Sequence, residues 1–485
     1  METQIVVLGA GPGGYAAAFL AADLGMEVTL IDREPRLGGV CLLRGCIPSK
    51  ALLHVAKAIV EAGHLADWGV DFKKPKIDVD KVRKQKEKVL ATLTGGLGQL
   101  AKKRNVRVVR ARATFEGSRT LRLEGVEGGS LDDDRIEFEH CILATGSRPA
   151  AVPGLDFDGD RVMDSGSALD LPDIPQRLLV LGGGYIGLEM GTVYAALGSK
   201  VTVVEMTDGL LPGADRDLVR PLAKRIEKQF EAVCLQTRVA SLDAKRNAVE
   251  VTFEGDVDEK VQSFDRVLIS VGRRPNSDAL GLENTQVEVD DDGFVRVNEK
   301  QQTADPAILA VGDVAGQPML AHKAAHQGKV AAEALAGKPA AFGPRAIPAV
   351  VFTDPEVAWA GVTETDAERE GRKVKTAVFP WAASGRAQAA GRTEGLTKWV
   401  IDPASERVIG CGIVGVGAGD LVSEAVLAIE MGCTVRDVAE TIHPHPTLSE
   451  TVAFAAEVYL GTVTDLYRPT QNSRETSSED RDSDR

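Results

Sequence analysis

The sequence predicts an α/β fold with two similar nucleotide-binding units and a C-terminal domain of a different pattern. A glycine-rich loop between a strand and a helix occurs near residue 9 and again near residue 182. From Ile347 onward the pattern changes to strand pairs and helices without such loops. Because 485 residues exceed the size at which a single core keeps growing, we expect three or more domains.

The composition is that of a soluble globular protein, with 44% hydrophobic and 26% charged residues. No apolar run approaches the roughly 18 residues of a membrane span, and the N-terminus has no signal or transit pattern. The net charge of −14 argues against a nucleic-acid partner and is compatible with a basic protein partner. Six cysteines do not make a disulfide scaffold, so we expect a reducing cytoplasm. Four of them lie in apolar contexts that indicate buried thiols: Cys141, Cys234, Cys411 and Cys433.

The first unit begins with an apolar strand at 5–8, a loop at 9–14 and an alanine-rich helix at 15–24. A second strand at 27–31 ends at Asp32, 23 residues after the first glycine of the loop. In such a G-x-G-x-x-G loop the glycines let backbone N–H groups approach a pyrophosphate, and the acid accepts a hydrogen bond from a ribose hydroxyl. The sequence therefore predicts a Rossmann-like site formed by Gly9, Gly11, Gly14 and Asp32.

The second unit repeats this arrangement, with strands at 178–181 and 200–204 around a loop and a helix. Its site residues are Gly182, Gly184, Gly187 and Glu205, and the acid again follows the first glycine by 23 residues. Two units predict two dinucleotides, such as a flavin and a nicotinamide; a duplicated unit that has lost its ligand is the alternative. Since a carboxylate at Glu205 would repel a 2′-phosphate and no cation follows it, NAD is favoured over its phosphorylated form.

Two cysteines, Cys41 and Cys46, lie in the string GGVCLLRGCIPSK at 38–50. In an ideal helix residues five apart are roughly 8–9 Å apart at Cα, whereas a disulfide needs about 4.4–6.8 Å. The pair therefore bonds only if the helix start is distorted, and a strained disulfide is easily reduced, as a catalytic dithiol requires. The alternative is that both are buried thiols without redox chemistry.

The remaining stretches predict a helix at 51–62 and a long helix at 80–103 that is interrupted at Gly95-Gly96. An antiparallel meander is expected at 106–138, followed by an apolar strand at 141–146. The segment from Pro469 to Arg485 has almost no apolar residue, which predicts a disordered tail.

The string at 38–50 resembles the redox-active disulfide segment of the flavin-dependent pyridine nucleotide–disulfide oxidoreductases, class I. Within that family it is most similar to the dihydrolipoamide dehydrogenase branch, from which it differs at Leu43 (usually Asn) and Arg44 (often Val). The family also usually has Glu at the position of Asp32. The resemblance covers about residues 4–467 and implies FAD and NAD as cofactors. The implied domains are FAD-binding at 1–150, NAD-binding at 151–275, a return to the FAD or central domain at 276–346, and an α+β interface (dimerisation) domain at 347–468.

The resemblance also implies further site residues around the flavin. Lys50 would lie beside the flavin and pair with Glu189, although a surface ion pair is the alternative. Asp313 would bind the ribityl chain, unless it is an ordinary acid at a strand end. Gly272 belongs to the segment that closes the NAD-binding domain. The other implied flavin contacts are Thr145, Gly146, Gly312, Met319, Leu320, Ala321 and His322.

Residues 442–450 match the family motif HxHPTxxE, in which the second histidine is the acid–base and the glutamate orients it. The resemblance assigns these roles to His445 and Glu450. A surface turn or a chance metal site is the alternative, but no third or fourth ligand pattern lies nearby, so no metal is predicted. The family commonly has Ala at the position of Pro444.

The implied activity is oxidation of protein-bound dihydrolipoamide. His445 would deprotonate a dihydrolipoyl thiol, the thiolate would attack Cys41 as the exposed sulfur, and Cys46 would leave against the flavin. The implied partners are a second copy in a homodimer and a lipoylated acyltransferase or carrier protein of a 2-oxo acid dehydrogenase or glycine-cleavage complex, with no nucleic acid and no membrane. Alternatives are a reductase for glutathione or mercuric ion, a transhydrogenase, and a non-catalytic scaffold subunit.

Overall fold

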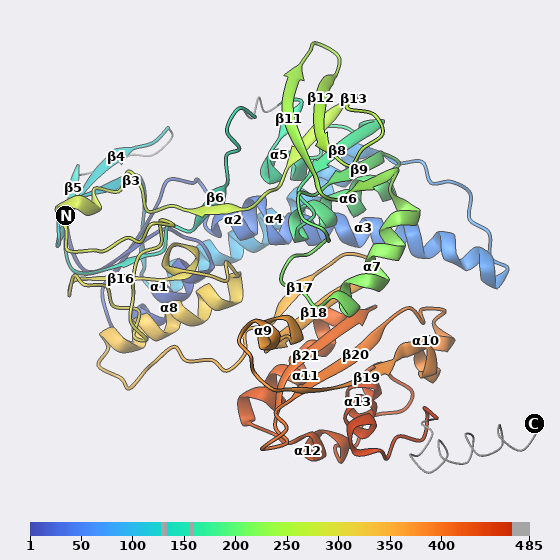
Figure 1. Ribbon diagram of the computed structural model, residues 1–485. Helices are drawn as coiled ribbons and strands as arrows, with labels where there is room; N and C mark the ends of the chain where they lie inside the picture. Colours follow the sequence, from blue (N-terminus) through green and yellow to red (C-terminus); the bar gives the residue numbers. More distant parts are fainter. Residues whose placement is uncertain (128–130, 132, 156–159, 468–485) are drawn as a thin grey trace, which may run out of the picture. The chain divides into compact units, whose positions relative to one another are not determined.

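A computed structural model of the chain describes residues 1–127, 131, 133–155 and 160–467, and the predicted disordered tail lies outside this part. The described residues form two compact units. Unit 1 contains residues 1–210 and 227–343, and unit 2 contains residues 211–226 and the chain from 344 onward (Figure 1). The sequence pattern did not predict that 211–226 would pack with the C-terminal part.

The first glycine-rich loop belongs to a six-stranded sheet of unit 1. Strands β2, β1, β5 and β16 are parallel, and β3 pairs in parallel with β2. Strand β4 joins β3 and β5 by antiparallel pairing. The strands are β1 (Glu2–Leu8), β2 (Val28–Asp32), β3 (Arg107–Gly117), β4 (Thr120–Gly125), β5 (Arg135–Leu143) and β16 (Ile308–Ala310).

The antiparallel meander predicted at 106–138 is present as β3, β4 and β5. The apolar strand predicted at 141–146 is confirmed at 141–143, which form the end of β5, whereas residues 144–146 lie beyond the strand. Residues 135–137 of β5 pair with β4 and residues 137–143 pair with β1, so one strand serves both the meander and the parallel core.

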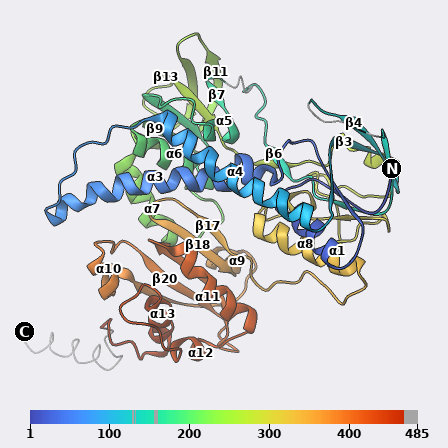
Figure 2. The same cartoon turned by 180° about the vertical axis from the view of Figure 1, so that it is seen from behind.

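Helices α1 (Pro12–Asp23) and α8 (Ala321–Leu335) pack closely against each other beside this sheet (Figure 2). A Cβ added at Gly328 would lie 2.3 Å from the carbonyl oxygen of Gly13, so only glycine permits this approach. The contact fixes the N-terminus of α1, where the glycine-rich loop ends.

The second glycine-rich loop belongs to a five-stranded parallel sheet in the order β10-β9-β8-β14-β7. These strands are β7 (Val162–Met163), β8 (Arg177–Leu181), β9 (Lys200–Val204), β10 (Ala232–Cys234) and β14 (Arg266–Ile269), with α5 (Ser165–Leu169) and α6 (Tyr185–Leu197) as helices. A three-stranded antiparallel sheet of β11 (Thr237–Ala244), β12 (Val249–Gly255) and β13 (Val261–Phe264), and a pair of β6 (Ser147–Pro149) and β15 (Arg273–Pro275), complete the strands of unit 1. Short 3₁₀ turns follow at η1 (Leu65–Trp68), η2 (Leu282–Asn284) and η3 (Gly312–Ala315).

Three helices carry the cysteine segment and its support: α2 (Gly39–Arg44), α3 (Cys46–His64) and α4 (Val79–Lys103). The predicted interruption of α4 at Gly95-Gly96 is wrong, since the helix continues through both glycines. A glycine inside a helix costs roughly 1 kcal/mol relative to alanine without breaking it.

By length and composition alone, the helical stretch Gly39–Trp68 could cross a membrane, which the sequence analysis did not expect. This is weak evidence, because core helices of soluble proteins meet the same criterion.

Unit 2 is built on an antiparallel sheet in the order β17-β18-β21-β20-β19. Its core contains Trp381 and Trp399, both 0% exposed, and the Trp399 indole donates to the carbonyl of Val452 on α13. The strands are β17 (Ala349–Val351), β18 (Glu356–Gly361), β19 (Lys375–Pro380), β20 (Leu396–Ile401) and β21 (Val408–Gly415). The helices are α7 (Arg216–Gln229), which begins in unit 2, α9 (Glu364–Arg369), η4 (Trp381–Ala383), α10 (Gly385–Ala389), α11 (Ala418–Met431), α12 (Val435–Ala439) and α13 (Glu450–Leu460).

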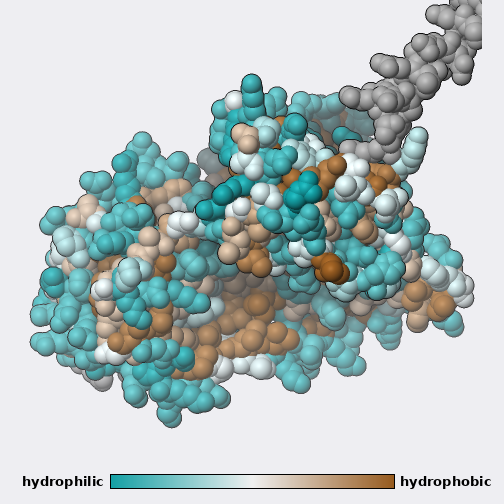
Figure 3. Space-filling view, turned by 90° about the horizontal axis from the view of Figure 1, so that it is seen from below, coloured by the Kyte–Doolittle hydropathy of each residue, from teal (hydrophilic) through white to brown (hydrophobic). Residues whose placement is uncertain are grey.

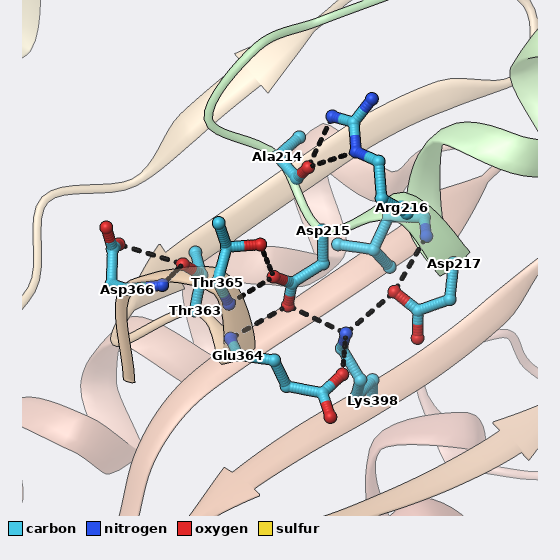
Figure 4. Close-up of polar contacts among 10 residues, drawn as sticks. Ala214, Asp215, Arg216, Asp217, Thr363, Glu364, Thr365, Asp366 and Lys398 are labelled. Carbon is cyan, nitrogen blue, oxygen red and sulfur yellow. Dashed lines mark hydrogen bonds and ion pairs between the residues drawn. The ribbon is translucent and has the colours of Figure 1, made fainter. Parts of the chain in front are cut away.

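A buried lysine explains why the start of α7 belongs to unit 2. Figure 4 shows the ammonium of Lys398 on β20 between three carboxylates. Its Nζ lies 2.7 Å from an oxygen of each of Asp215, Asp217 and Glu364, and its side chain is 1% exposed. Asp215 in turn accepts hydrogen bonds from the backbone N–H groups of Glu364 and Thr365 at the start of α9. This cluster ties α7, α9 and β20 together.

The same three acids are the group in the described part of the chain that could hold a metal ion. The Lys398 ammonium already supplies a positive charge at hydrogen-bonding distance from all three. Removing one partner from a buried ion cluster leaves uncompensated charge and typically costs about 3–5 kcal/mol. We therefore interpret the cluster as structural.

Candidate active site

Both glycine-rich loops are held by the same close contacts. A Cβ at Gly14 would lie 1.8 Å from the oxygen of Gly9, and a Cβ at Gly187 would lie 2.2 Å from the oxygen of Gly182. The third glycine of each motif thus packs its helix onto the first glycine, as a dinucleotide-binding turn requires. Gly11 and Gly184 are the N-caps of α1 and α6 and use no side chain for capping.

The acids that end the second strand of each unit also have the same contacts. The Asp32 carboxylate accepts from the N–H of Ala10 at 2.6 Å, and Glu205 accepts from the N–H of Gly183 at 2.7 Å. Each also accepts from the N–H two residues further along, at Glu34 and Thr207. Burial raises the pKa of Asp32, although these two N–H groups lower it. Each acid is therefore held against its loop, where a ribose hydroxyl can reach it.

A cavity of about 460 Å³ in unit 1 joins most of the predicted flavin residues. It is lined by residues that lie far apart in the sequence, including both cysteines, both ends of the Lys50–Glu189 pair and the acids Asp32 and Asp313. Further predicted residues in the lining are Gly9, Gly11, Thr145, Gly146, Gly312, Met319 and Ala321, whereas Gly14, Leu320 and His322 are not part of it.

The two cysteines lie on different helices. Cys41 is in α2 and Cys46 begins α3, and Gly45 between them has a non-helical backbone conformation (φ −149°, ψ −113°). A Cβ at Gly45 would lie 3.0 Å from the oxygen of Val40 and 3.3 Å from the Cα of Cys41. The expected distortion of the helix start is thus present, and it consists of a break at glycine.

The two thiols differ in acidity. The Cys41 thiol donates a hydrogen bond to the sulfur of Cys46, and together with the nearby charge of Lys50 this lowers the pKa of Cys46 to about 7. The same hydrogen bond and burial raise the pKa of Cys41. At neutral pH the thiolate therefore resides on Cys46, which is the sulfur expected to face the flavin.

The exposure of the sulfurs differs from the expectation. Cys41 was expected to be the exposed sulfur, yet Cys41 is half-buried and Cys46 is exposed within unit 1. Both residues line the same cavity, so either sulfur is open to it. Exposure alone thus does not assign the sulfur that attacks substrate, and acidity is the better guide.

Lys50 and Glu189 form the ion pair that the sequence suggested. Lys50 Nζ lies 2.7 Å from Glu189 Oε2, and Ser49 Oγ donates to the same oxygen at 2.8 Å. Glu189 is 5% exposed and Lys50 is 33% exposed, so the alternative of a surface pair does not hold for the glutamate. The pair joins α3 to α6 and places a positive charge beside Cys46.

Asp313 is held by residues that the sequence reading did not assign. Its carboxylate accepts from Ser147 Oγ at 2.5 Å, and Arg273 Nε donates to that hydroxyl at 2.7 Å. The buried ammonium of Lys323 donates to the carbonyls of Gly312 and Gly316 on either side of Asp313. Burial lowers the pKa of Lys323 to about 8, and the charge of Asp313 opposes this shift.

Asn276 is a further residue that sequence reasoning missed. Its side-chain amide donates to the carbonyl of Thr145, and the Thr145 hydroxyl donates to the carbonyl of Asn276. Arg273 lies in the segment at 271–275, which the sequence analysis interpreted only as the end of the NAD-binding domain, and Asn276 follows it directly. Their place in or beside this segment was the sequence signal that could have marked both residues.

In unit 2, His445 and Glu450 form the predicted pair. His445 Nδ1 lies 2.9 Å from Glu450 Oε1, and the other carboxylate oxygen accepts from the N–H of Thr447. Because an ionised carboxylate only accepts, Nδ1 carries the proton and Nε2 has its lone pair available as a base. The His445 side chain is 79% exposed and Glu450 is 12% exposed. The carbonyl oxygen of Pro444, where the family commonly has Ala, accepts a hydrogen bond from the Thr447 hydroxyl. This bond joins the two sides of the loop around His445.

The neighbouring His443 makes a second pair that sequence reasoning missed. Its Nε2 lies 2.6 Å from Glu424 on α11, and its Nδ1 lies 2.8 Å from the carbonyl oxygen of Thr441. The imidazole is 7% exposed and anchors the loop that carries His445.

Comparison with known proteins assigns the fold. Residues 3–328 match the family described as "Pyridine nucleotide-disulphide oxidoreductase", and residues 347–456 match its dimerisation domain. The chain belongs to this family. The family and the fold class predicted from the sequence are thus confirmed.

Curated relatives named dihydrolipoyl dehydrogenase are similar over nearly the whole chain. Those of Vibrio cholerae and Haemophilus influenzae are both 50% identical, over 96% of this chain and 97% of their own. That of Halobacterium salinarum is 44% identical over 95% of this chain and 96% of its own.

Among solved structures, LpdA from Mycobacterium tuberculosis has a TM-score of 0.86 at 27% identity, covering 94% of this chain and 99% of that one. The HOCl-induced flavoprotein disulfide reductase RclA from Escherichia coli has a TM-score of 0.81 at 27% identity, covering 93% of this chain and 98% of that one.

The residues fit the flavin that the family implies. A side chain at Gly11 would project into the cavity between the loop and Gly39, the nearest atom being the Gly39 Cα at 3.9 Å. The start of α1 has free backbone N–H groups for a pyrophosphate, and Asp32 and Asp313 supply carboxylates to hydroxyl groups. These residues would hold FAD along the cavity, next to Cys46 and Lys50.

The acidity of Cys46 gives a pH prediction. In the reduced wild-type enzyme, Cys46 should react with iodoacetamide before Cys41 and increasingly as pH rises, with a midpoint near pH 7, because its thiolate forms as pH passes the lowered pKa. Lys50→Met should move the midpoint up by roughly one pH unit, since a neighbouring cation no longer favours the thiolate. Mass spectrometry of the Cys46 peptide measures the reaction.

Lys57→Met is the matched control, because Lys57 lies further along α3 and should leave the midpoint unchanged. A Cys46 midpoint near the ordinary thiol value of 9 in the reduced wild-type enzyme would refute the assignment of the thiolate to Cys46.

Proposed function

We propose that this chain oxidises a protein-bound dihydrolipoyl group and passes the electrons through Cys41 and Cys46 and FAD to NAD. The observation that carries this proposal is the dithiol in the cavity of unit 1, with the acidic thiol at Cys46 beside Lys50. The names of the relatives at 44–50% identity support the substrate. RclA is less similar in sequence, at 27% identity, so a reductase of that kind is the weaker candidate.

The chain's own groups account for the proton and sulfur steps. His445 Nε2 takes a proton from the dihydrolipoyl thiol, while Glu450 holds the ring and stabilises its charge. The substrate thiolate then attacks the Cys41 sulfur of the Cys41–Cys46 disulfide, and Cys46 leaves as the more stable thiolate. The second substrate thiol displaces Cys41, so the substrate becomes a cyclic disulfide and both cysteines are reduced.

Bound FAD supplies two-electron transfer from the dithiol to the nicotinamide. Lys50, held by Glu189, places positive charge beside Cys46 and the cavity, where it favours negative charge. In total the dihydrolipoyl group loses two electrons and two protons, NAD⁺ accepts a hydride, and one proton is released. Asp313 and Asp32, which both line the cavity, would accept hydrogen bonds from hydroxyl groups of the cofactor.

Glu205 determines the choice of nicotinamide in this proposal. Its carboxylate is held by Gly183 and Thr207 at the place where a 2′-hydroxyl binds. We expect the wild type to prefer NAD strongly, and Glu205→Arg to narrow the difference between NAD and NADP. The ratio of kcat/KM for the two cofactors measures this, and equal use of both by the wild type would contradict the role of Glu205.

We also propose a homodimer whose two sites each use both chains. The match to the dimerisation domain supports a second copy. Large hydrophobic side chains of unit 2 are strongly exposed near the His445 loop, among them Leu427 (63%) and Met431 (72%) on α11 and Ile442 (96%) beside His443. Hydrophobic patches are also visible between hydrophilic side chains on the face of the molecule in Figure 3. Exposed hydrophobic residues next to the His445 loop are typical of an interface.

Mixing two inactive variants tests the shared site. In a heterodimer of a Cys41→Ser chain and a His445→Ala chain, one site carries both lesions and the other carries neither if His445 acts on the disulfide of the second copy. The purified heterodimer should therefore have about half the activity of wild-type dimers with dihydrolipoamide and NAD, although each variant alone is nearly inactive. If both residues of one chain formed the site, each site would carry one lesion, so a verified heterodimer without activity would rule out the shared site.

A lipoylated acyltransferase or carrier protein of a 2-oxo acid dehydrogenase or glycine-cleavage complex is the partner that this substrate implies. The cytoplasmic location stays a prediction from the use of cysteine.

A further inference from the structure

Arg44 is the residue at which this chain differs most in charge from the family pattern, and it has a defined partner. It ends α2, between the two cysteines, and its guanidinium contacts the carboxylate of Glu34 with both terminal nitrogens. The distances are 2.6 Å from Nη2 to Oε1 and 3.3 Å from Nη1 to Oε2. The stem of Arg44 packs 3.7–3.8 Å from the Cβ position of Gly166 at the start of α5.

Glu34 lies in the lining of the unit 1 cavity, close to the predicted ribose-binding acid. It follows the ribose-binding Asp32 by two residues, and its own N–H donates to Asp32 Oδ1 at 2.8 Å. Asp32, Glu34 and Arg44 all line the cavity of unit 1, and Asp32 and Glu34 also line a second cavity of about 600 Å³ beside it. Two carboxylates therefore face the path of a cofactor whose pyrophosphate is itself anionic.

The charge of Glu34 is compensated mainly by Arg44. The hydrogen bond from Arg44 is the largest cause that lowers the pKa of Glu34, and Glu34 is the largest cause that raises the pKa of Arg44. Arg33 lies farther away, with its Nε 3.9 Å from Glu34 Oε1. Glu34 is 21% exposed, so solvent screens its charge only in part.

We propose that Arg44 is a positioning residue for FAD retention, because it neutralises Glu34 beside the ribose-binding acid. A cationic side chain at this position of the redox segment thus balances an acid at the adenosine end of the cleft. The proposal rests on FAD occupying this cleft, as the proposed function requires, but its test uses no substrate.

The rate at which FAD leaves the purified holoenzyme tests this role. After dilution, the fluorescence of released FAD should rise about tenfold faster for Arg44→Met than for wild type, since Glu34 then loses its main cationic partner beside the anionic cofactor. Glu34→Gln should release FAD no faster than wild type. The double variant Glu34→Gln/Arg44→Met gives the sharpest test. Its rate of FAD release should return to within about twofold of wild type, because it also removes the carboxylate charge that Arg44 compensates.

Higher salt should shrink the difference between Arg44→Met and wild type, which a purely structural defect would not show. The matched control is Arg36→Met, which removes an arginine that pairs with Glu87 and is not part of the cavity lining of Arg44. It should release FAD at the wild-type rate.

The proposal is overturned if Arg44→Met releases FAD at the rate of Arg36→Met, or if the double variant is at least as fast as Arg44→Met. Should Arg44→Met fail to fold, the double variant decides alone: release within about twofold of wild type supports the role, and release about tenfold faster contradicts it. A wild-type protein that purifies without FAD and does not take it up would instead refute the proposed function.

Discussion

One carboxylate oxygen, Oε2 of Glu189, connects the parts of unit 1 that the chemistry needs. Lys50 and Ser49 both donate to it, so the helix that begins with Cys46 is joined to the helix that begins at the second glycine-rich loop. A buried acid must be paired, because an unpaired charge away from water is very costly. The pairing then fixes the Lys50 ammonium beside Cys46, where it favours the thiolate while the charge of Glu189 opposes it. The acidity of the redox pair thus depends on the contact between the two nucleotide-binding parts.

The duplicated unit is more than a repeat of glycines. In both copies a carboxylate accepts from an N–H of the loop and from the N–H two residues after itself. Asp32 is one methylene shorter than Glu205, yet its contact with the loop is as short, at 2.6 Å against 2.7 Å. The departure from the usual glutamate is therefore accommodated by the backbone. The nearby Glu34 and its partner Arg44 form a second departure, and the two are linked through the N–H of Glu34.

Local patterns predicted the nucleotide loops well, because strand, glycine spacing and terminal acid all lie within about 25 residues of one another. The His445–Glu450 pair was equally accessible, since both residues lie in one short motif. Contacts between distant segments were not predictable in this way. Lys398 lies more than 180 residues after Asp215 and Asp217, and nothing local marks it as the cation that draws α7 into unit 2. The network of Ser147, Arg273 and Asp313 was missed for the same reason. The interruption expected in α4 is wrong because two glycines weaken a helix without ending it.

The central claim is that dihydrolipoyl thiols reduce the cysteine pair with His445 as the base. Stopped-flow reduction of the oxidised enzyme by dihydrolipoamide, followed at long wavelength where a Cys46 thiolate against the flavin absorbs, tests it most directly. The wild-type enzyme should be reduced rapidly by dihydrolipoamide. Reduction of the His445→Gln variant by dihydrolipoamide should be at least about 100-fold slower, as expected for loss of a general base. Reduction by NADH, which needs no base for a substrate thiol, should stay within a fewfold of wild type. Equal rates of reduction by dihydrolipoamide in wild type and His445→Gln, or no reduction of the wild type at all, would contradict the account.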